Sequence, residues 1–268
     1  MFAMNATTTQ PTPETRPARF YYSFARSQAQ IDDSLALRYR VFVEEMGATA
    51  ALAGAGLEAD AMDAYCLHLV VRDRRDDRAV ASTRILTHEA AQAAGGFYSA
   101  SEFDLDAVLA CPGRFLEIGR TCVDAAYRRS PAMAVLWAGI ADLIRADRYD
   151  HLIGCASIDL RDGLAFAHAT YRQIWARQPA EAHRCVRPRL ALPSADVPLD
   201  RAVRLPPLIK AYLRVGACVG GPPCYDPDFN VADVFMHLDL NRLTPRYARH
   251  FLGKTLDGHE RSAARLSA

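Results

Sequence analysis

The chain has 268 residues, enough for one large domain with a sizeable core, and its 50% hydrophobic and 24% charged content is ordinary for a globular protein. The net charge of +1 provides no global field that would attract nucleic acid, so we expect no nucleic-acid partner. No uncharged run reaches the ~18 residues of a membrane-spanning helix, and any membrane contact is therefore expected to be peripheral.

The seven cysteines show neither a disulfide nor a zinc pattern. Their number is odd, no CxxC is present, and no set of cysteines and histidines has the spacing of a metal site. We therefore predict reduced cysteines, a cytoplasmic protein and no metal site. Residues 1–18 are rich in Thr and Pro and contain no apolar segment, so they predict a disordered leader and not a secretory signal.

Strands and helices alternate along the chain from residue 20 onward. Capping residues such as Asp32 or Asp33 indicate helix starts, and short apolar runs rich in β-branched and aromatic residues indicate strands. In chain order the pattern predicts a strand at 20–24, a helix at 32–47, a mobile loop at 48–64, a hairpin at 66–73 and 79–86, a helix at 102–109, a central strand at 115–123, a helix at 132–144, a strand at 151–158, helices at 164–175 and 208–216, and a strand at 231–238.

This order of elements predicts an α/β (α+β) fold in which helices flank a mixed central sheet. No stretch divides the chain cleanly, so we expect a single domain at residues 19–252, followed by a flexible basic tail at residues 253–268.

The predicted central strand carries two charged side chains, Glu117 and Arg120. Burial of an unpaired charge costs several kcal/mol, so the two side chains either face solvent or line a polar site. A separation of three residues places them on opposite faces of a regular strand. A bulge near Gly119 would bring them closer together.

Charged groups also interrupt other apolar elements. Together with the two charges of the central strand they form a set that suits a small zwitterionic substrate, because arginines bind a carboxylate bidentately, acidic groups receive an amine, and one carboxylate can act as a base. For Arg38, which shares a helix face with Phe42, a stem that covers apolar surface is the alternative. The set is Arg38, Asp60, Asp63, Arg84, Glu117 and Arg120.

This series resembles the one shared by acyl-homoserine-lactone synthases, which are GNAT-fold acyltransferases. The matching segments are Arg38-Tyr-Arg-Val-Phe42, Asp60-Ala-Met-Asp63, Arg84-Ile-Leu86 and Glu117-Ile-Gly-Arg120. A closer likeness, over about residues 20–252, is to ornithine lipid synthases, the L-ornithine N-acyltransferases that use 3-hydroxyacyl carrier protein. Gly119, where lactone synthases usually carry Ser, and the additional C-terminal segment both favour the ornithine enzymes.

The resemblance implies a GNAT-like fold and transfer of a 3-hydroxyacyl chain from acyl carrier protein to the α-amine of L-ornithine, which gives lyso-ornithine lipid without a further cofactor. Glu117 is the implied general base, directly or through a water, and a backbone N–H near Thr121 or Cys122 is expected to stabilise the oxyanion. Asp60 and Asp63 are expected to receive the side-chain ammonium or to close the loop. The implied substrate-binding residues are Arg38, Phe42, Asp60, Asp63, Arg84 and Arg120.

The turn before the predicted helix at 132–144 bears on the acyl donor. GNAT enzymes that bind CoA carry Q/R-x-x-G-x-G/A here, whereas this turn reads Arg128-Arg-Ser-Pro-Ala-Met133, in which the glycines are missing and Pro131 has no N–H. Two arginines could instead hold the single phosphodiester of a carrier-bound phosphopantetheine, and a plain charged turn is the alternative. The expected contacts of this arm are Thr121, Cys122, Val123, Arg128 and Arg129.

Three other functions stay open at this point. The acceptor could be another amine, such as a homoserine-lactone precursor, glycine or lysine; the enzyme could be a CoA-dependent acetyltransferase; or the chain could be a non-catalytic module on the same fold. Because the implied product is amphiphilic, we also expect peripheral attachment to the inner membrane through the basic tail and the helix near residues 205–215.

Overall fold

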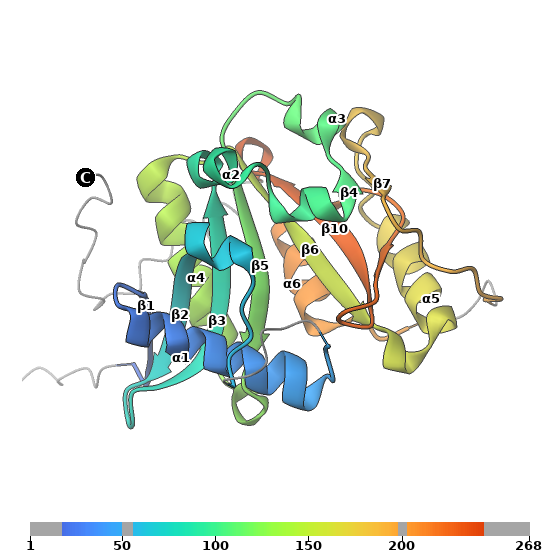
Figure 1. Cartoon of the computed structure of the whole chain (residues 1–268). Coiled ribbons are helices and arrows are strands. Elements are labelled where there is room, and N and C mark those ends of the chain that lie inside the picture. Colours follow the sequence, from blue (N-terminus) through green and yellow to red (C-terminus); the bar gives the residue numbers. More distant parts are fainter. Residues whose placement is uncertain (1–17, 50–55, 198–202, 244–268) are drawn as a thin grey trace, which may run out of the picture.

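A computed structural model of the chain describes residues 18–49, 56–197 and 203–243. The expected basic tail, and the expected leader apart from its last residue, lie outside these ranges. Within them, helices flank both faces of a mixed β-sheet (Figure 1), as the sequence predicts. None of the helices in the described ranges combines the length and the apolar composition that a bilayer crossing requires.

The main sheet has the strand order β1-β2-β3-β5-β6-β10-β8, and β9 pairs with β10. Neighbouring strands are antiparallel except β5 and β6, which are parallel. A second sheet pairs β4 (Phe103–Asp104) with β7 (Arg187–Pro188). The strands of the main sheet are β1 (Phe20–Phe24), β2 (Leu67–Asp73), β3 (Arg78–Thr87), β5 (Phe115–Val123), β6 (His151–Asp159), β8 (Cys218–Val219), β9 (Cys224–Asp226) and β10 (Val231–Asp239).

One face of the sheet packs against α4 (Ala132–Asp147), α5 (Leu164–Trp175) and α6 (Pro207–Val215), and these share the main hydrophobic core with the strands. α4 lies close to the sheet, because a Cβ at Gly139 would come within 2.9–3.0 Å of side chains on β1 and β2. The apolar residues of α6 that enter this core include Ile209 and Tyr212, both almost fully buried.

The opposite face carries α1 (Gln28–Arg38), a π-helical turn (Tyr39–Glu45) and α2 (His88–Ala94) (Figure 1). The segment from residue 97 to 111, which includes α3 (Asp106–Leu109), packs a second apolar cluster on this face. The part of this face between α1 and residues 97–111 is covered by neither of them. The polar side chains of the site described below lie on this part of the sheet.

The predicted strands and the helices at 132–144, 164–175 and 208–216 are confirmed within a few residues. The predicted cap at Asp32 or Asp33 is wrong: the helix begins at Gln28, and the Ser27 side chain accepts the cap hydrogen bond from the backbone N–H of Gln30.

Two further sequence predictions need correction. Of the predicted helix at 102–109 only α3 forms, because residues 103–104 pair with β7 instead. The predicted loop at 48–64 contains a short 3₁₀ helix (Ala61–Tyr65) capped by Asp60, and its residues 50–55 lie outside the described ranges.

Candidate active site

β5 contains a bulge opposite β3. Arg84 pairs with Gly119 and Ser82 pairs with Cys122, so two steps along β3 correspond to three along β5. Arg120 occupies the extra position with a φ of +49°, a left-handed conformation that is uncommon for a non-glycine residue.

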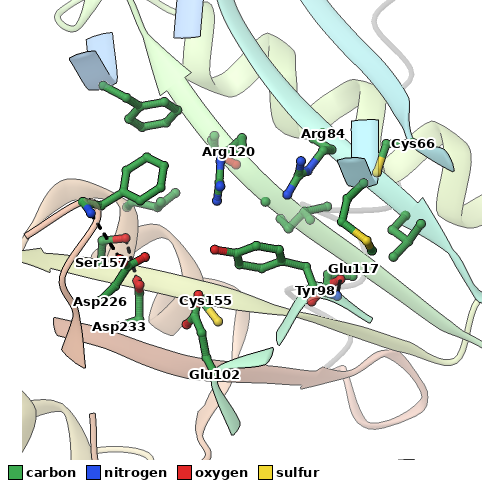
Figure 2. Close-up of a pocket in the computed structure, with 18 residues that line it drawn as sticks. Cys66, Arg84, Tyr98, Glu102, Glu117, Arg120, Cys155, Ser157, Asp226 and Asp233 are labelled. Carbon is green, nitrogen blue, oxygen red and sulfur yellow. Dashed lines mark hydrogen bonds between the residues drawn. The ribbon is translucent and has the colours of Figure 1, made fainter. Parts of the chain in front are cut away.

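The bulge changes which side chains share a face of the sheet. Residues four apart in a regular strand point the same way, yet Ile118 packs in the core beneath α4 and Cys122 packs with α1 on the other face. Glu117 and Arg120 line the same pocket as a result (Figure 2). A bulge near Gly119, one of the two arrangements that the sequence leaves open, is present, although Arg120 and not the glycine adopts the left-handed conformation.

The pocket lies where β5 and β6 part. Their parallel pairing joins residues 115–117 to 151–153. At the next position a Cβ on Gly154 would lie 2.3 Å from the carbonyl oxygen of Ile118, so only glycine permits this approach. The pocket has about 710 Å³ of empty space including its open mouth. Residues of four strands line it: Arg84 and Leu86 of β3, residues 117–121 of β5, Cys155 and Ser157 of β6, and Asp233 of β10.

Arg38 is the centre of a buried ion-pair network beside this pocket. It is fully buried, donates from Nε to Glu58, and donates from Nη1 and Nη2 to the two oxygens of Asp63 at 2.6 and 3.1 Å. Burial by itself would raise the pKa of Asp63, but the hydrogen bonds and charge of Arg38 outweigh it and lower that pKa to about 2. Arg38 therefore fixes the segment before β2 through two carboxylates.

Arg84 and Arg120 extend the network to the pocket wall. Arg84 Nη1 donates to Oδ1 of Asp60, and Arg120 Nη2 donates to Oδ2 of the same carboxylate at 3.1 Å. The oxygens of Asp60 and Asp63 are thus occupied by arginines and backbone N–H groups, and neither residue is among those lining the pocket. This geometry does not support the expectation that they receive a substrate ammonium.

Aromatic rings hold the two arginines in place. The guanidinium carbons of Arg84 and Arg120 lie 5.2 and 4.8 Å from the ring centre of Tyr98, and Phe229 packs 4.4 Å from Arg120. Phe42 meets Phe229 edge-to-face at 5.8 Å and also lines the pocket. Arg84 is 3% exposed, and its Nη2 has no hydrogen-bond partner among the described residues. A buried unpartnered donor costs about 1–3 kcal/mol, so this nitrogen favours a ligand with an anionic acceptor.

Glu117 lies against the turn at residues 98–101. Its Oε2 accepts from the backbone N–H of Tyr98 at 2.7 Å, and its Oε1 accepts from the N–H and hydroxyl of Ser99 at 2.8 and 2.5 Å. Burial raises the pKa of Glu117, while these hydrogen bonds and the charge of Arg84 oppose the increase. Three of about four acceptor positions of the carboxylate are used, which leaves one on Oε2.

The end of the pocket away from Arg84 is acidic (Figure 2). Glu102, Asp226 and Asp233 each offer one carboxylate oxygen within 4.8 Å of the others. Ser157 donates to Asp233 at 2.6 Å, whereas Glu102 Oε2 is buried without a hydrogen-bond partner in the described parts of the chain. Burial and the nearby carboxylates raise the pKa of Glu102 to about 8 and that of Asp233 to about 6.

The residues expected to contact the carrier arm fall into two places. Thr121 lines the pocket at the bulge, but the side chains of Cys122 and Val123 are buried in apolar clusters on opposite faces of the sheet. Arg128 and Arg129 are exposed in the turn between β5 and α4, where Arg128 holds a carboxylate of the π-helical turn through two hydrogen bonds of 2.6 Å.

Sequence reasoning does not identify several residues of this site. Asp233 interrupts an apolar strand as Arg84 does, so the same argument about buried charge would find it. The turn at 98–101 carries no such signal, because its contact with Glu117 depends on tertiary packing. The residues not identified are Tyr98, Ser99, Glu102, Asp226 and Asp233.

Comparison with known proteins relates the chain to acyltransferases. Residues 37–138 match the Acetyltransferase (GNAT) domain family. The L-ornithine N(alpha)-acyltransferase of Rhizobium meliloti (strain 1021) is 36% identical over 254 residues, which cover 88% of this chain and 85% of that protein. The protein of the same name from Rhodobacter capsulatus is 35% identical over 258 residues, which cover 90% of this chain and 98% of that protein.

Solved structures show the same fold. The AHL synthase LasI matches with a TM-score of 0.52 and 11% identity, over 91% of this chain and 100% of that one. BjaI, a CoA-dependent acyl-homoserine lactone synthase solved with MTA, matches with a TM-score of 0.51 and 15% identity, over 84% of this chain and 83% of that one. The predicted GNAT-like fold is thereby confirmed.

Proposed function

The chain belongs to the family of L-ornithine N(alpha)-acyltransferases, and from this premise we propose that it transfers a 3-hydroxyacyl chain from the thioester of an acyl carrier protein to the α-amine of L-ornithine. The product is a lyso-ornithine lipid. The observation that carries the proposal is the pocket at the parting of β5 and β6. It holds both the buried carboxylate of Glu117 and Nη2 of Arg84, which has no hydrogen-bond partner in the described part of the chain. This pair suits an amino acid that is held by its carboxylate and deprotonated at its amine.

In the proposed reaction the α-amine loses a proton and attacks the thioester carbonyl. Glu117 takes the proton, directly or through a water, at the remaining acceptor position of Oε2, and its raised pKa makes it a better base near neutral pH. A backbone N–H at the bulge, near Thr121, stabilises the oxyanion. The C–S bond then breaks, the nitrogen loses its second proton to solvent as the amide forms, and the leaving thiolate takes up the proton that Glu117 accepted. The carrier thiol is released, so the reaction requires neither a covalent enzyme intermediate nor a further cofactor.

The strand geometry also supports binding of the acyl donor. The pairing of β5 with β6 ends after three residues, and a strand that parts from its neighbour presents backbone N–H and C=O groups along its edge. An extended phosphopantetheine arm carries amide groups that such an edge can pair with. Arg129, which forms no ion pair with any described residue, lies with Arg128 at the end of this path, where a phosphodiester would be held by charge.

We further propose that the protein binds the inner membrane peripherally, because its product is amphiphilic. α6 packs Ile209 and Tyr212 into the core, so its contribution would come from charged residues such as Arg214 and not from a free apolar face. Co-sedimentation with anionic liposomes at low salt tests this; protein that stays in the supernatant would contradict it.

The experiment that tests the proposed function is an assay of the purified protein with L-ornithine and either 3-hydroxyacyl carrier protein or the matching CoA thioester. We expect thiol release and an acylated ornithine with the carrier substrate, and little product with the CoA thioester. Product formed only from the CoA thioester would contradict the proposed donor, and no product with either donor would contradict the proposed function.

A further inference from the structure

An arginine and a glutamate, Arg84 and Glu102, lie toward opposite ends of the pocket (Figure 2). At one end Nη2 of Arg84 has no acceptor, and at the other Oε2 of Glu102 has no donor, among the described residues. Both side chains are more than nine-tenths buried, with 3% and 8% of their surface exposed. Tyr98 stands between them, and its ring packs on Arg84. A ligand that satisfies both atoms must carry a hydrogen-bond acceptor at one position and a donor at another, and a zwitterion with an anionic and a cationic group at separate positions meets this requirement.

We propose that Glu102, Asp226 and Asp233 bind the side-chain ammonium of the amino-acid substrate and thereby select ornithine over amino acids that lack a second amine. The inference rests on the proposed function and assigns a role within the same pocket. It places the substrate carboxylate at Arg84, the δ-ammonium at the acidic cluster, and the α-amine between them on the side of Glu117.

The hydrogen bonds of the cluster fit an ammonium ligand. Ser157 donates to Oδ1 of Asp233, and the backbone N–H groups of residues 228 and 229 donate to Oδ1 of Asp226. These bonds fix both aspartates and leave Oδ2 of each without a hydrogen bond from the described residues, while one carboxylate oxygen of each of the three residues lies within 4.8 Å of the others. An ammonium has three N–H donors and no acceptor, which matches three converging carboxylate oxygens.

The electrostatics of the cluster also favour a cation. The carboxylates of Glu102 and Asp233 are almost fully buried and lie close to that of Asp226, so burial and mutual repulsion disfavour their charged forms and raise the pKa of both buried groups. A bound cation relieves this repulsion. The charge of Arg120 lowers the pKa of Asp233 but does not offset burial, and the hydrogen bonds of Arg120 go to Glu58 and Asp60 in the neighbouring network.

The test uses L-norvaline, which is ornithine without the δ-amine, beside L-ornithine. Wild-type protein, Glu102→Gln, Asp233→Asn and the control Asp147→Asn, an exposed carboxylate at the end of α4, are assayed for kcat/KM at saturating 3-hydroxyacyl carrier protein. Loss of a hydrogen bond to a charged group corresponds to a roughly 10- to 100-fold change. We expect the kcat/KM of the wild type to be higher for ornithine than for norvaline by at least this factor. In each cluster variant, kcat/KM for ornithine should fall by this factor, whereas kcat/KM for norvaline should stay unchanged. The control should match the wild type.

The outcomes separate this inference from the function on which it rests. Equal use of ornithine and norvaline by the wild type would overturn the role of the cluster and leave acyl transfer intact, and this comparison does not depend on the folding of any variant. Cluster variants that lose both substrates equally would also overturn it. Activity that is lost with EDTA and restored by a divalent cation would assign the cluster to a metal instead. Absence of acyl product with every amino acid would refute the proposed function itself.

Discussion

Glu117 and Arg120 face the same pocket although they are three positions apart along one strand. Arg120 absorbs the extra residue of the bulge with a left-handed backbone, a conformation that costs of the order of 1–3 kcal/mol and persists where the surroundings hold it. Its ion pairs with Glu58 and Asp60 and its contact with Phe229 provide that support. The bulge thus brings a candidate base, Glu117, and the guanidinium group of Arg120 to one site.

Replacement of Glu117 by Gln should lower kcat for ornithine acylation by roughly 10²- to 10⁴-fold, the usual contribution of general-base catalysis. KM should change little, because the substrate carboxylate is assigned to Arg84. Steady-state kinetics test this, with thermal unfolding as the check that the turn at 98–101 still packs on the substituted side chain. A variant with wild-type kcat would exclude Glu117 as the base.

Substitution of Arg84 by Lys should keep the charge and lose Nη2. A hydrogen bond to a charged group is worth about 1.5–3 kcal/mol, so kcat/KM for ornithine should fall roughly 10- to 100-fold. 1,4-Diaminobutane, which is ornithine without its carboxylate, provides the matched control: the wild type should use it poorly and the variant should use it no worse. An equal loss with both amines would mean that Arg84 does not bind the carboxylate.

The pKa of Asp63 predicts how acid affects stability. Its folded value of about 2 lies below the ordinary 3.8, so the ion pair with Arg38 stabilises the fold above pH 4, and this stabilisation is lost as the pH falls through 2. A difference of about two pH units corresponds to about 2–3 kcal/mol. Asp63→Asn should therefore lower the free energy of unfolding by this amount at pH 7, and the deficit should shrink between pH 4 and 2. Denaturant titrations at several pH values measure it; a deficit independent of pH would contradict the assignment.

Two glycines of the pocket strands should respond differently to alanine. A Cβ at Gly154 would lie 2.3 Å from a backbone oxygen of β5, so Gly154→Ala must shift one strand and should cost about 1–3 kcal/mol or more. Gly119 has no atom within 4 Å of the corresponding position, and Gly119→Ala should leave stability nearly unchanged. Melting temperatures of the two variants provide the comparison, and equal melting temperatures would count against the close approach of β5 and β6.

Much of the fold could be predicted from local patterns. Apolar runs and turn residues locate the strands, and the charged pair in β5 together with Gly119 indicates where a bulge could form. The start of α1 could not be placed in this way, because Ser27, Asp32 and Asp33 are all acceptable caps and only the packing of the helix decides among them.

Residue patterns alone locate the candidate site where a charge interrupts an apolar strand, and the family resemblance adds Phe42 and Thr121, which also line the pocket. Arg84, Glu117 and Arg120 meet that criterion and line the pocket. Asp60 and Asp63 stand in a polar segment, where the sequence does not reveal that arginines occupy their oxygens. The acidic cluster draws on three separate segments, and its proximity is a property of the tertiary structure alone.

Ornithine must bind in an orientation in which the α-amine, and not the δ-amine, meets the acyl thioester. Tandem mass spectrometry of the product formed from 3-hydroxyacyl carrier protein and L-ornithine tests this most directly. We predict an amide on the α-nitrogen with the δ-amine free. An amide on the δ-nitrogen would contradict the assignment of the carboxylate to Arg84 and of the ammonium to the acidic cluster.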